Sequence, residues 1–188
     1  MAGLAGLDET GRRLVLFDNA CTLSRCMHYL HDYFKISGAV SSAFKCYWEE
    51  IMNADQIAIV QETFEKVRPI SETVAELFYK RLFELNPSFK SLFKGDMKKQ
   101  GRMLMQMIDF AVKGIDEPDT ILPTIQDLGK RHVGYGVKEE YYSTVGEALL
   151  WTLEQGLGKD FTPDAKEAWT VAYELLSGVM KDAVRETN

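Results

Sequence analysis

The sequence predicts an all-α fold for residues 52–188. In this region apolar residues recur at intervals of three and four, which is the period of a helix that buries one face. Proline and glycine interrupt the pattern at several points, and no segment alternates apolar and polar residues as a strand does. We therefore expect about six or seven helices of unequal length around one core.

The first half of this region contains three predicted helices. The apolar positions of residues 57–67 define the first helix and those of residues 74–85 the second, and a proline follows each of them. A short turn over residues 88–93 and a loop come next. The third helix carries its apolar face over residues 104–111 and ends near Gly114.

The second half contains three more predicted helices. Four residues spaced by four, three and four positions indicate one buried face: Ile121, Ile125, Leu128 and His132. His132, the only histidine after Met52, therefore shares a face with apolar residues. Another helix spans about residues 142–156. Thr162-Pro163 then predicts the N-cap and first residue of a long last helix.

The charge and composition exclude several classes of partner. The net charge is −6 and no run of basic residues is present, which argues against nucleic acid and anionic membranes. No apolar run reaches the roughly 18 residues of a membrane helix, and the N-terminus lacks the basic flank of a signal peptide. Three cysteines, an odd number, argue against a disulfide scaffold. The sequence thus predicts a soluble cytoplasmic protein.

Residues 1–51 differ from the rest and are predicted to be an N-terminal extension, disordered or loosely helical, before a domain over residues 52–188. This segment holds four residues that zinc can bind: Cys21, Cys26, His28 and His31. Their spacing matches no usual zinc-finger pattern, so a metal site is the weaker interpretation. A second interpretation is that Met52 is the natural start and that the upstream segment is mis-assigned.

Several residues of the helical region are together specific for one protein family, although no single one of them is. Their order and spacing carry this signal: Phe78-Tyr79, Asn86-Pro87, Leu92-Phe93, Gln100, the run from Leu128 to Val137, Val145-Gly146 and Trp169. By these residues the chain from Met52 to about Val184 resembles a globin, specifically the single-domain bacterial globins that are similar to the haem domain of flavohaemoglobins. The resemblance implies the globin fold, a three-over-three helical sandwich around haem b.

The resemblance also implies which residues contact the cofactor. His132 corresponds to the proximal ligand of the haem iron, a role for which imidazole is well suited. Phe93 corresponds to an aromatic residue wedged against the porphyrin. Other expected pocket residues are Leu104, Leu128, Tyr135, Val137 and Tyr142. For most of these residues an ordinary core position explains the sequence equally well.

Tyr79 and Gln100 correspond to residues that face the gas ligand on the distal side. A tyrosine hydroxyl and an amide N–H can each donate a hydrogen bond to bound dioxygen. From the helical period alone, Tyr79 is explained equally well as a buried core residue. Gln100 is explained equally well as a solvated surface residue. The hypothesis is that both side chains face the ligand.

The resemblance leaves more than one function open. The first is reversible binding of dioxygen and other diatomic gases, as a carrier, store or scavenger. The second is a nitric oxide dioxygenase, which would need a separate reductase because we expect none in this chain. A gas sensor ranks below both. Val184 stands where flavohaemoglobins have a carboxylate that activates the proximal histidine, and Glu186 is about two residues away. This difference argues against peroxidase-like chemistry.

Overall fold

The computed structural model describes residues 48–185, and these residues are helical almost throughout. A helical turn over residues 48–51 precedes six longer helices: α3 (Ala54–Val67), α4 (Ser71–Leu85), α5 (Met97–Lys113), α6 (Pro118–Gly134), α7 (Tyr141–Leu157) and α8 (Pro163–Arg185). Short 3₁₀ segments follow three of them: η1 (Arg68–Ile70), η2 (Pro87–Leu92) and η3 (Gly158–Asp160). The described residues contain no strand, so the prediction of an all-α fold is confirmed.

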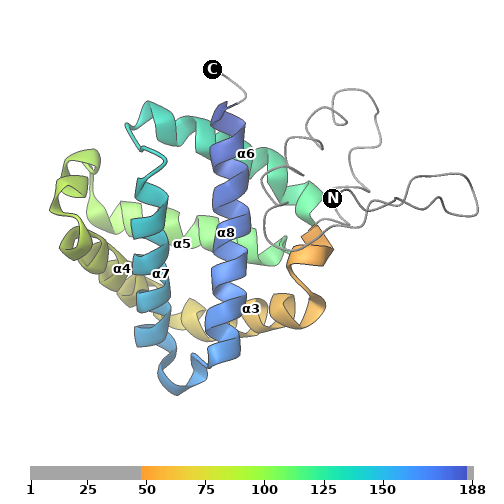
Figure 1. The fold of residues 1–188 in the computed structure, drawn as a ribbon. Coiled ribbons are helices and arrows are strands. Elements are labelled where there is room, and N and C mark those ends of the chain that lie inside the picture. The colour runs from red at the N-terminus through yellow and green to blue at the C-terminus, as the bar shows by residue number, and fades with distance from the viewer. Residues whose placement is uncertain (1–47, 186–188) are drawn as a thin grey trace, which may run out of the picture. The chain divides into compact units, whose positions relative to one another are not determined.

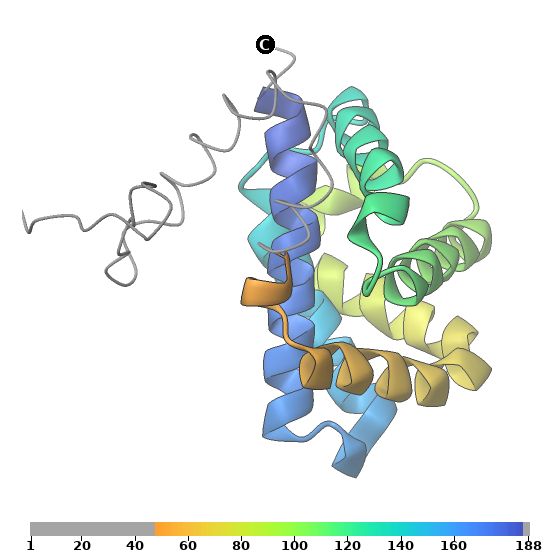
Figure 2. The ribbon, with the colours of Figure 1, turned by 90° about the vertical axis from the view of Figure 1, so that its right-hand side faces the viewer.

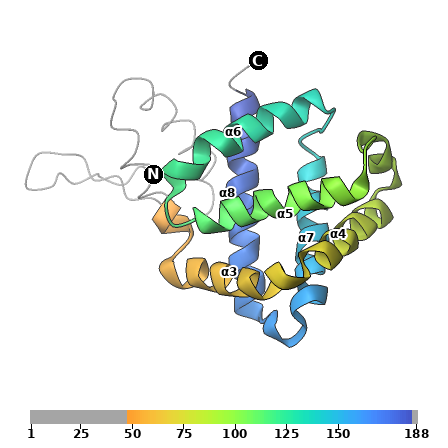
Figure 3. The ribbon, with the colours of Figure 1, turned by 180° about the vertical axis from the view of Figure 1, so that it is seen from behind.

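The helices form two crossing layers. In Figure 3, α3, α5 and α6 cross in front of α7 and α8, which run side by side. Helix α4 packs against both α7 and α5 (Figure 1). Figure 2 shows α6 beside the C-terminal part of α8, whereas α3 crosses its N-terminal part. This arrangement is the three-over-three sandwich that the sequence predicted. No helix among the described residues has both the length and the apolar character to span a membrane.

Polar side chains fix where the helices begin. Asn53 caps α3 through a reciprocal pair of hydrogen bonds with Gln56, at 2.9 and 3.1 Å. The Asp96 carboxylate accepts a hydrogen bond of 2.8 Å from the backbone N–H of Lys98 and so caps α5. The Thr162 hydroxyl accepts from the backbone N–H of Ala165 at 3.2 Å, which confirms the predicted N-cap of α8.

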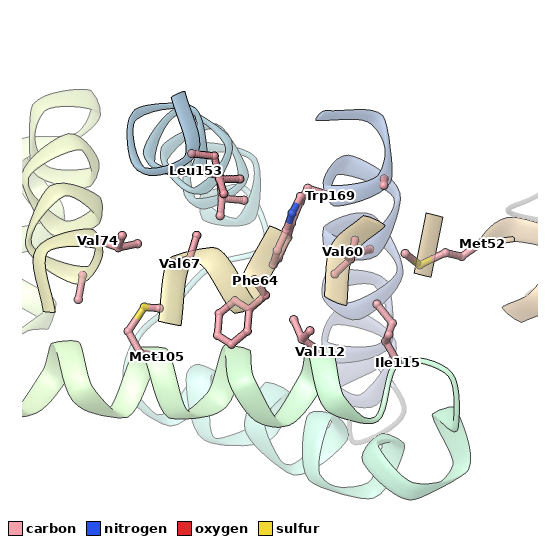
Figure 4. Close-up of a cluster of buried hydrophobic side chains, with 14 of the residues drawn as sticks. Met52, Val60, Phe64, Val67, Val74, Met105, Val112, Ile115, Leu153 and Trp169 are labelled. Atoms are coloured by element: carbon pink, nitrogen blue, oxygen red, sulfur yellow. The ribbon is translucent and has the colours of Figure 1, made fainter. Parts of the chain in front are cut away.

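Two tryptophans join distant segments of the main core. The indole N–H of Trp169 in α8 donates to the Thr63 hydroxyl in α3 at 2.9 Å. The indole N–H of Trp48 donates to the carbonyl of Ile115 at 2.8 Å, and only 1% of Trp48 is exposed. Figure 4 shows Met52 and Ile115 in the same apolar cluster. The packed core therefore includes Trp48, which precedes Met52. The sequence had predicted that the domain begins at Met52.

Helices α6 and α8 approach each other closely at Gly129. A Cβ atom at this position would lie 2.4 Å from the backbone carbonyl oxygen of Met180. Such a distance is sterically forbidden, so the two helices can approach this closely only because residue 129 has no side chain. His132 lies one helical turn further along α6, and its position relative to α8 therefore depends on this contact.

The substitution Trp48→Ala is expected to destabilise the fold by about 3–5 kcal/mol, because it removes a fully buried indole. Trp48→Phe keeps an aromatic ring but leaves the Ile115 carbonyl unpaired, which should cost about 1–3 kcal/mol. Urea unfolding of the full chain measures both effects. A Trp48→Ala protein as stable as the wild type would refute the contribution assigned to Trp48.

The substitution Gly129→Ala is expected to reduce stability by about 1–3 kcal/mol, because the new methyl group overpacks the α6–α8 contact. Gly134→Ala is the matched control. Gly134 is the last residue of the same helix, and no heavy atom outside the local backbone lies within 4 Å of its Cβ position. The control should therefore be neutral or slightly stabilising. Equal unfolding free energies for the two variants would refute the role assigned to Gly129.

Candidate functional site

An apolar cavity lies between the two helical layers and receives side chains from α3 to α8. None of the described residues that line it is Asp, Glu, Lys or Arg. Its polar side chains other than Trp169 are the following: Tyr79, Gln100, His132, Tyr141, Tyr142, Tyr173 and Ser177. Hydrophobic walls with few polar groups are typical of a site for a largely apolar ligand that is oriented by specific contacts.

His132 lines this cavity from the last turn of α6 and is partly buried. Its Nδ1 lies 2.8 Å from the carbonyl oxygen of Leu128. A carbonyl oxygen can only accept a hydrogen bond, so Nδ1 carries the proton and Nε2 keeps a lone pair. Burial lowers the pKa of His132, a hydrogen bond to Leu128 partly opposes this, and Arg131 lowers it slightly further. The imidazole is therefore mainly neutral at pH 7, the form that binds metals.

Tyr79 of α4 and Gln100 of α5 meet at another part of the cavity wall. Only 7% of Tyr79 is exposed. Burial raises the pKa of the Tyr79 hydroxyl, and a hydrogen bond with the Gln100 side chain opposes this in part. The hydroxyl therefore stays protonated and remains a hydrogen-bond donor. The structure thus brings together the two side chains for which the sequence predicted a common role.

An aromatic cluster supports this pair. The ring centroid of Phe93 lies 5.2 Å from that of Tyr79 and 5.6 Å from that of Phe83, both in edge-to-face geometry. Phe93 follows η2 and lines the cavity directly. Edge-to-face packing fixes the orientation of each ring relative to its neighbours. The orientation of the Tyr79 ring is therefore set by packing against its aromatic neighbours.

Tyr142 and Tyr173 line the cavity from α7 and α8. The Tyr173 hydroxyl donates a hydrogen bond of 2.6 Å to the backbone carbonyl of Tyr142, and burial raises the pKa of that hydroxyl. The pKa of Tyr142 is raised by burial and by the nearby Glu139. The Tyr173 ring packs onto Gly146, where a Cβ atom would lie 2.6 Å from it. These contacts hold α7 and α8 in fixed register beside the cavity.

The remaining predicted pocket residues occupy different environments. Leu128 and Val137 line the cavity. Leu104 packs against the cluster formed by Phe78 and Tyr79 and is not among the side chains that line the cavity. Tyr135 is 62% exposed, so its predicted place in the pocket wall is wrong. The reason is that α6 ends at Gly134, so residue 135 no longer continues the buried face of that helix.

Other residues considered from the sequence give no additional site. Cys21, Cys26, His28, His31 and Glu186 lie outside the described residues. Within residues 48–185, no group of three or more histidine, cysteine or acidic side chains is arranged to hold a metal ion. Any metal at the cavity would therefore depend on His132 and on a cofactor that supplies further ligands.

Sequence reasoning did not select Tyr141, Tyr173 and Ser177 as cavity residues. Tyr173 lies four residues after Trp169, and Ser177 four residues later, so their helical spacing gave a usable signal. That spacing marks only a shared face of α8. Whether the face meets a cavity or packed side chains depends on the neighbouring helices. Tyr141 packs against Phe89, with ring centroids 4.6 Å apart, a contact between segments about 50 residues apart.

Comparison with known proteins agrees with this geometry. A family model described as globin matches residues 76–180. A flavohemoprotein of Halalkalibacterium halodurans is 35% identical over 124 residues, and one of Bacillus subtilis is 32% identical over 130 residues. These matches cover 64% and 68% of this chain but 30% and 32% of the relatives. The chain thus spans about a third of their length.

Two solved structures share the fold. A bacterial globin from Campylobacter jejuni has a TM-score of 0.63 and 26% identity, and the match covers 71% of this chain and 96% of that one. A hexacoordinated heme protein from an anhydrobiotic tardigrade has a TM-score of 0.65 with the same coverage, but its 17% identity supports the fold alone. Together with the family match, the two helical layers and the cavity between them show that this chain belongs to the globin family.

Proposed function

We propose that this globin binds haem b in the cavity, with His132 as the axial ligand of the iron, and binds dioxygen reversibly as a cytoplasmic carrier, store or scavenger. Membership of the globin family implies haem binding. The observation that carries the proposal is that a metal-competent histidine and two hydrogen-bond donors line one apolar cavity. When bound, haem would supply an iron atom that takes a diatomic gas at its open position.

The cavity residues fit such a cofactor. Nε2 of His132 has a free lone pair, because the Leu128 carbonyl holds the proton on Nδ1. The carbonyl also fixes the orientation of the ring. The walls that would contact a porphyrin face are apolar or aromatic, and Phe93 and Leu128 are among them. Uncharged walls suit a macrocycle whose faces are apolar.

Tyr79 and Gln100 supply the polar contacts for the gas. Because burial keeps the Tyr79 hydroxyl protonated, it can donate a hydrogen bond to an oxygen atom that carries partial negative charge. The Gln100 amide can donate a second bond and is a poor ligand for iron. Each bond contributes on the order of 1 kcal/mol, so the pair should slow the escape of dioxygen relative to an apolar pocket.

A second candidate function is nitric oxide dioxygenation, in which nitric oxide, dioxygen and one electron give nitrate. It is favoured by the similarity to proteins named flavohemoprotein, at up to 35% identity. The same Tyr79–Gln100 pair would serve this reaction. The electron must come from a reductase, which we propose to be a separate protein. Sustained nitrate formation with an added reductase separates this function from simple oxygen binding.

The substitution His132→Gly is expected to prevent the protein from retaining haem, so that the desalted protein loses its haem absorption, because it removes the only proposed axial side chain. Added imidazole should restore the absorption by occupying the space left by the ring. Val133→Ala is the matched control, since this side chain follows His132 in the same helix, is 51% exposed and should leave the spectrum unchanged. An unchanged spectrum of His132→Gly without imidazole would contradict the proposed ligand.

The substitutions Tyr79→Phe and Gln100→Leu are each expected to increase the oxygen dissociation rate about fivefold, the equivalent of one lost hydrogen bond of about 1 kcal/mol. Stopped-flow displacement of dioxygen by carbon monoxide measures this rate. Tyr141→Phe is the control, because Tyr141 also lines the cavity but contacts Phe89. If the variant with both substitutions releases oxygen at the wild-type rate, neither side chain contacts the ligand.

A further inference from the structure

Positive charge gathers in one segment of an acidic protein. Residues 80–102 contain seven basic side chains and two acidic ones, a net charge of +5, whereas the whole chain carries −6. Five of the basic residues, from η2 to the first turns of α5, define what we call the basic patch: Lys90, Lys94, Lys98, Lys99 and Arg102. All five are exposed.

The basic side chains of the patch form no ion pairs with other described residues. In the described part of the chain, no ion pair joins any of its five side chains to an acidic residue. Asp96 lies between them, but its carboxylate caps α5 by accepting from the backbone N–H groups of Lys98 and Lys99. By contrast, Arg81 in the same segment pairs with Glu84 and Glu147. The five side chains therefore form no ion pair within the described residues, although Lys98 and Arg102 line a hollow that also contains Glu72 and Glu76.

Two residues of the basic patch are adjacent in sequence to residues that line the cavity. Lys94 directly follows Phe93, and Lys99 directly precedes Gln100; Phe93 and Gln100 both line the cavity. The Lys90 ammonium lies 6.0 Å from the centroid of the Phe83 ring, which packs edge-to-face on Phe93. A protein docked on the patch would thus contact residues adjacent in sequence to the cavity wall.

We propose that the basic patch is the docking surface for an acidic electron-transfer protein that carries a flavin or an iron–sulfur centre. This inference rests on the proposed haem site and on the second candidate function, nitric oxide dioxygenation, which requires ferric iron to be returned to the ferrous state. One electron leaves the reduced centre of the partner and reduces ferric haem to ferrous haem; no covalent bond forms or breaks and no proton is required. Complementary charge would steer the encounter and orient the partner toward the cavity.

A compact acidic protein fits better than an extended polyanion. Charges are screened over about 8 Å at physiological ionic strength, so a small partner is influenced mainly by the patch itself. A membrane or nucleic acid would also meet the acidic surface that gives the chain its net charge of −6. The local excess of positive charge therefore favours a partner whose contact area is similar to that of the patch.

The test compares two double charge reversals of equal net charge in the full, haem-loaded chain. Lys94→Glu with Lys99→Glu alters the basic patch. Lys159→Glu with Lys166→Glu is the matched control, since both lysines are exposed and lie near the α7–α8 turn, at the bottom of Figures 1 and 3 and away from the α4–α5 loop. The probe is a reduced flavodoxin, a small acidic flavoprotein, and stopped-flow absorption measures the rate at which it reduces the ferric protein.

We expect the patch variant to be reduced about tenfold more slowly than the wild type at low salt, and the difference to vanish at high salt. The control variant should react at nearly the wild-type rate. Reduction by dithionite, a small anion, should differ far less between the variants, which shows that the haem pocket is intact. If both variants are reduced equally slowly, or if neither is slowed, the proposed docking surface is wrong, but the proposed haem site is not affected.

A second measurement does not depend on haem. Calorimetric titration of the haem-free chain with oxidised flavodoxin should show binding that the patch variant loses and the control retains. If the chain takes up no haem, the proposed function fails, and this titration still tests the docking surface. Binding to phosphatidylglycerol vesicles that requires Lys94 and Lys99, together with unchanged reduction by flavodoxin, would instead identify a membrane-binding surface and refute the proposal.

Discussion

The contact between α6 and α8 at Gly129 is the constraint on which the cavity depends. Because no side chain separates Gly129 from the Met180 backbone, α6 lies close against α8, and His132 is held one turn away at the cavity wall. The Leu128 carbonyl then fixes the tautomer and the orientation of the imidazole. Backbone geometry, rather than a polar network among side chains, thus positions the proposed iron ligand.

The distal residues are positioned by a different means. Helices α4 and α5 approach closely at Ala75 and Gly101, where a Cβ atom on the glycine would lie 3.0 Å from that of Ala75. This crossing brings Tyr79 and Gln100, one residue before Gly101, to the same part of the cavity wall. The surrounding aromatic rings restrict Tyr79 further. Small residues at two helix crossings therefore set the distance between the proposed proximal and distal sides of the cavity.

The distribution of charge divides the molecule into functional zones. The described cavity wall carries no charged side chain, and burial in it lowers the pKa of His132 and raises the pKa of Tyr79. Charges lie outside, and on the segment beside Phe93 and Gln100 they are mainly positive. A low-dielectric interior suits the binding of an uncharged gas, whereas the adjacent basic patch suits contact with an acidic protein. Gas binding in the cavity and docking of an acidic protein on the basic patch thus use different residues.

The sequence by itself determined the helices, their ends and the family, because helical period, proline breaks and capping residues act over a few neighbouring positions. It also selected His132, Tyr79 and Gln100, although only through the resemblance, since periodicity alone gave each of them a second interpretation. The tertiary structure decided which faces meet. It exposed Tyr135, brought Tyr173 into the cavity wall and placed Trp48 in the core. These outcomes depend on contacts between residues far apart in the chain, such as Trp48 with Ile115 and Gly129 with Met180, and short-range patterns carry no information about such distances.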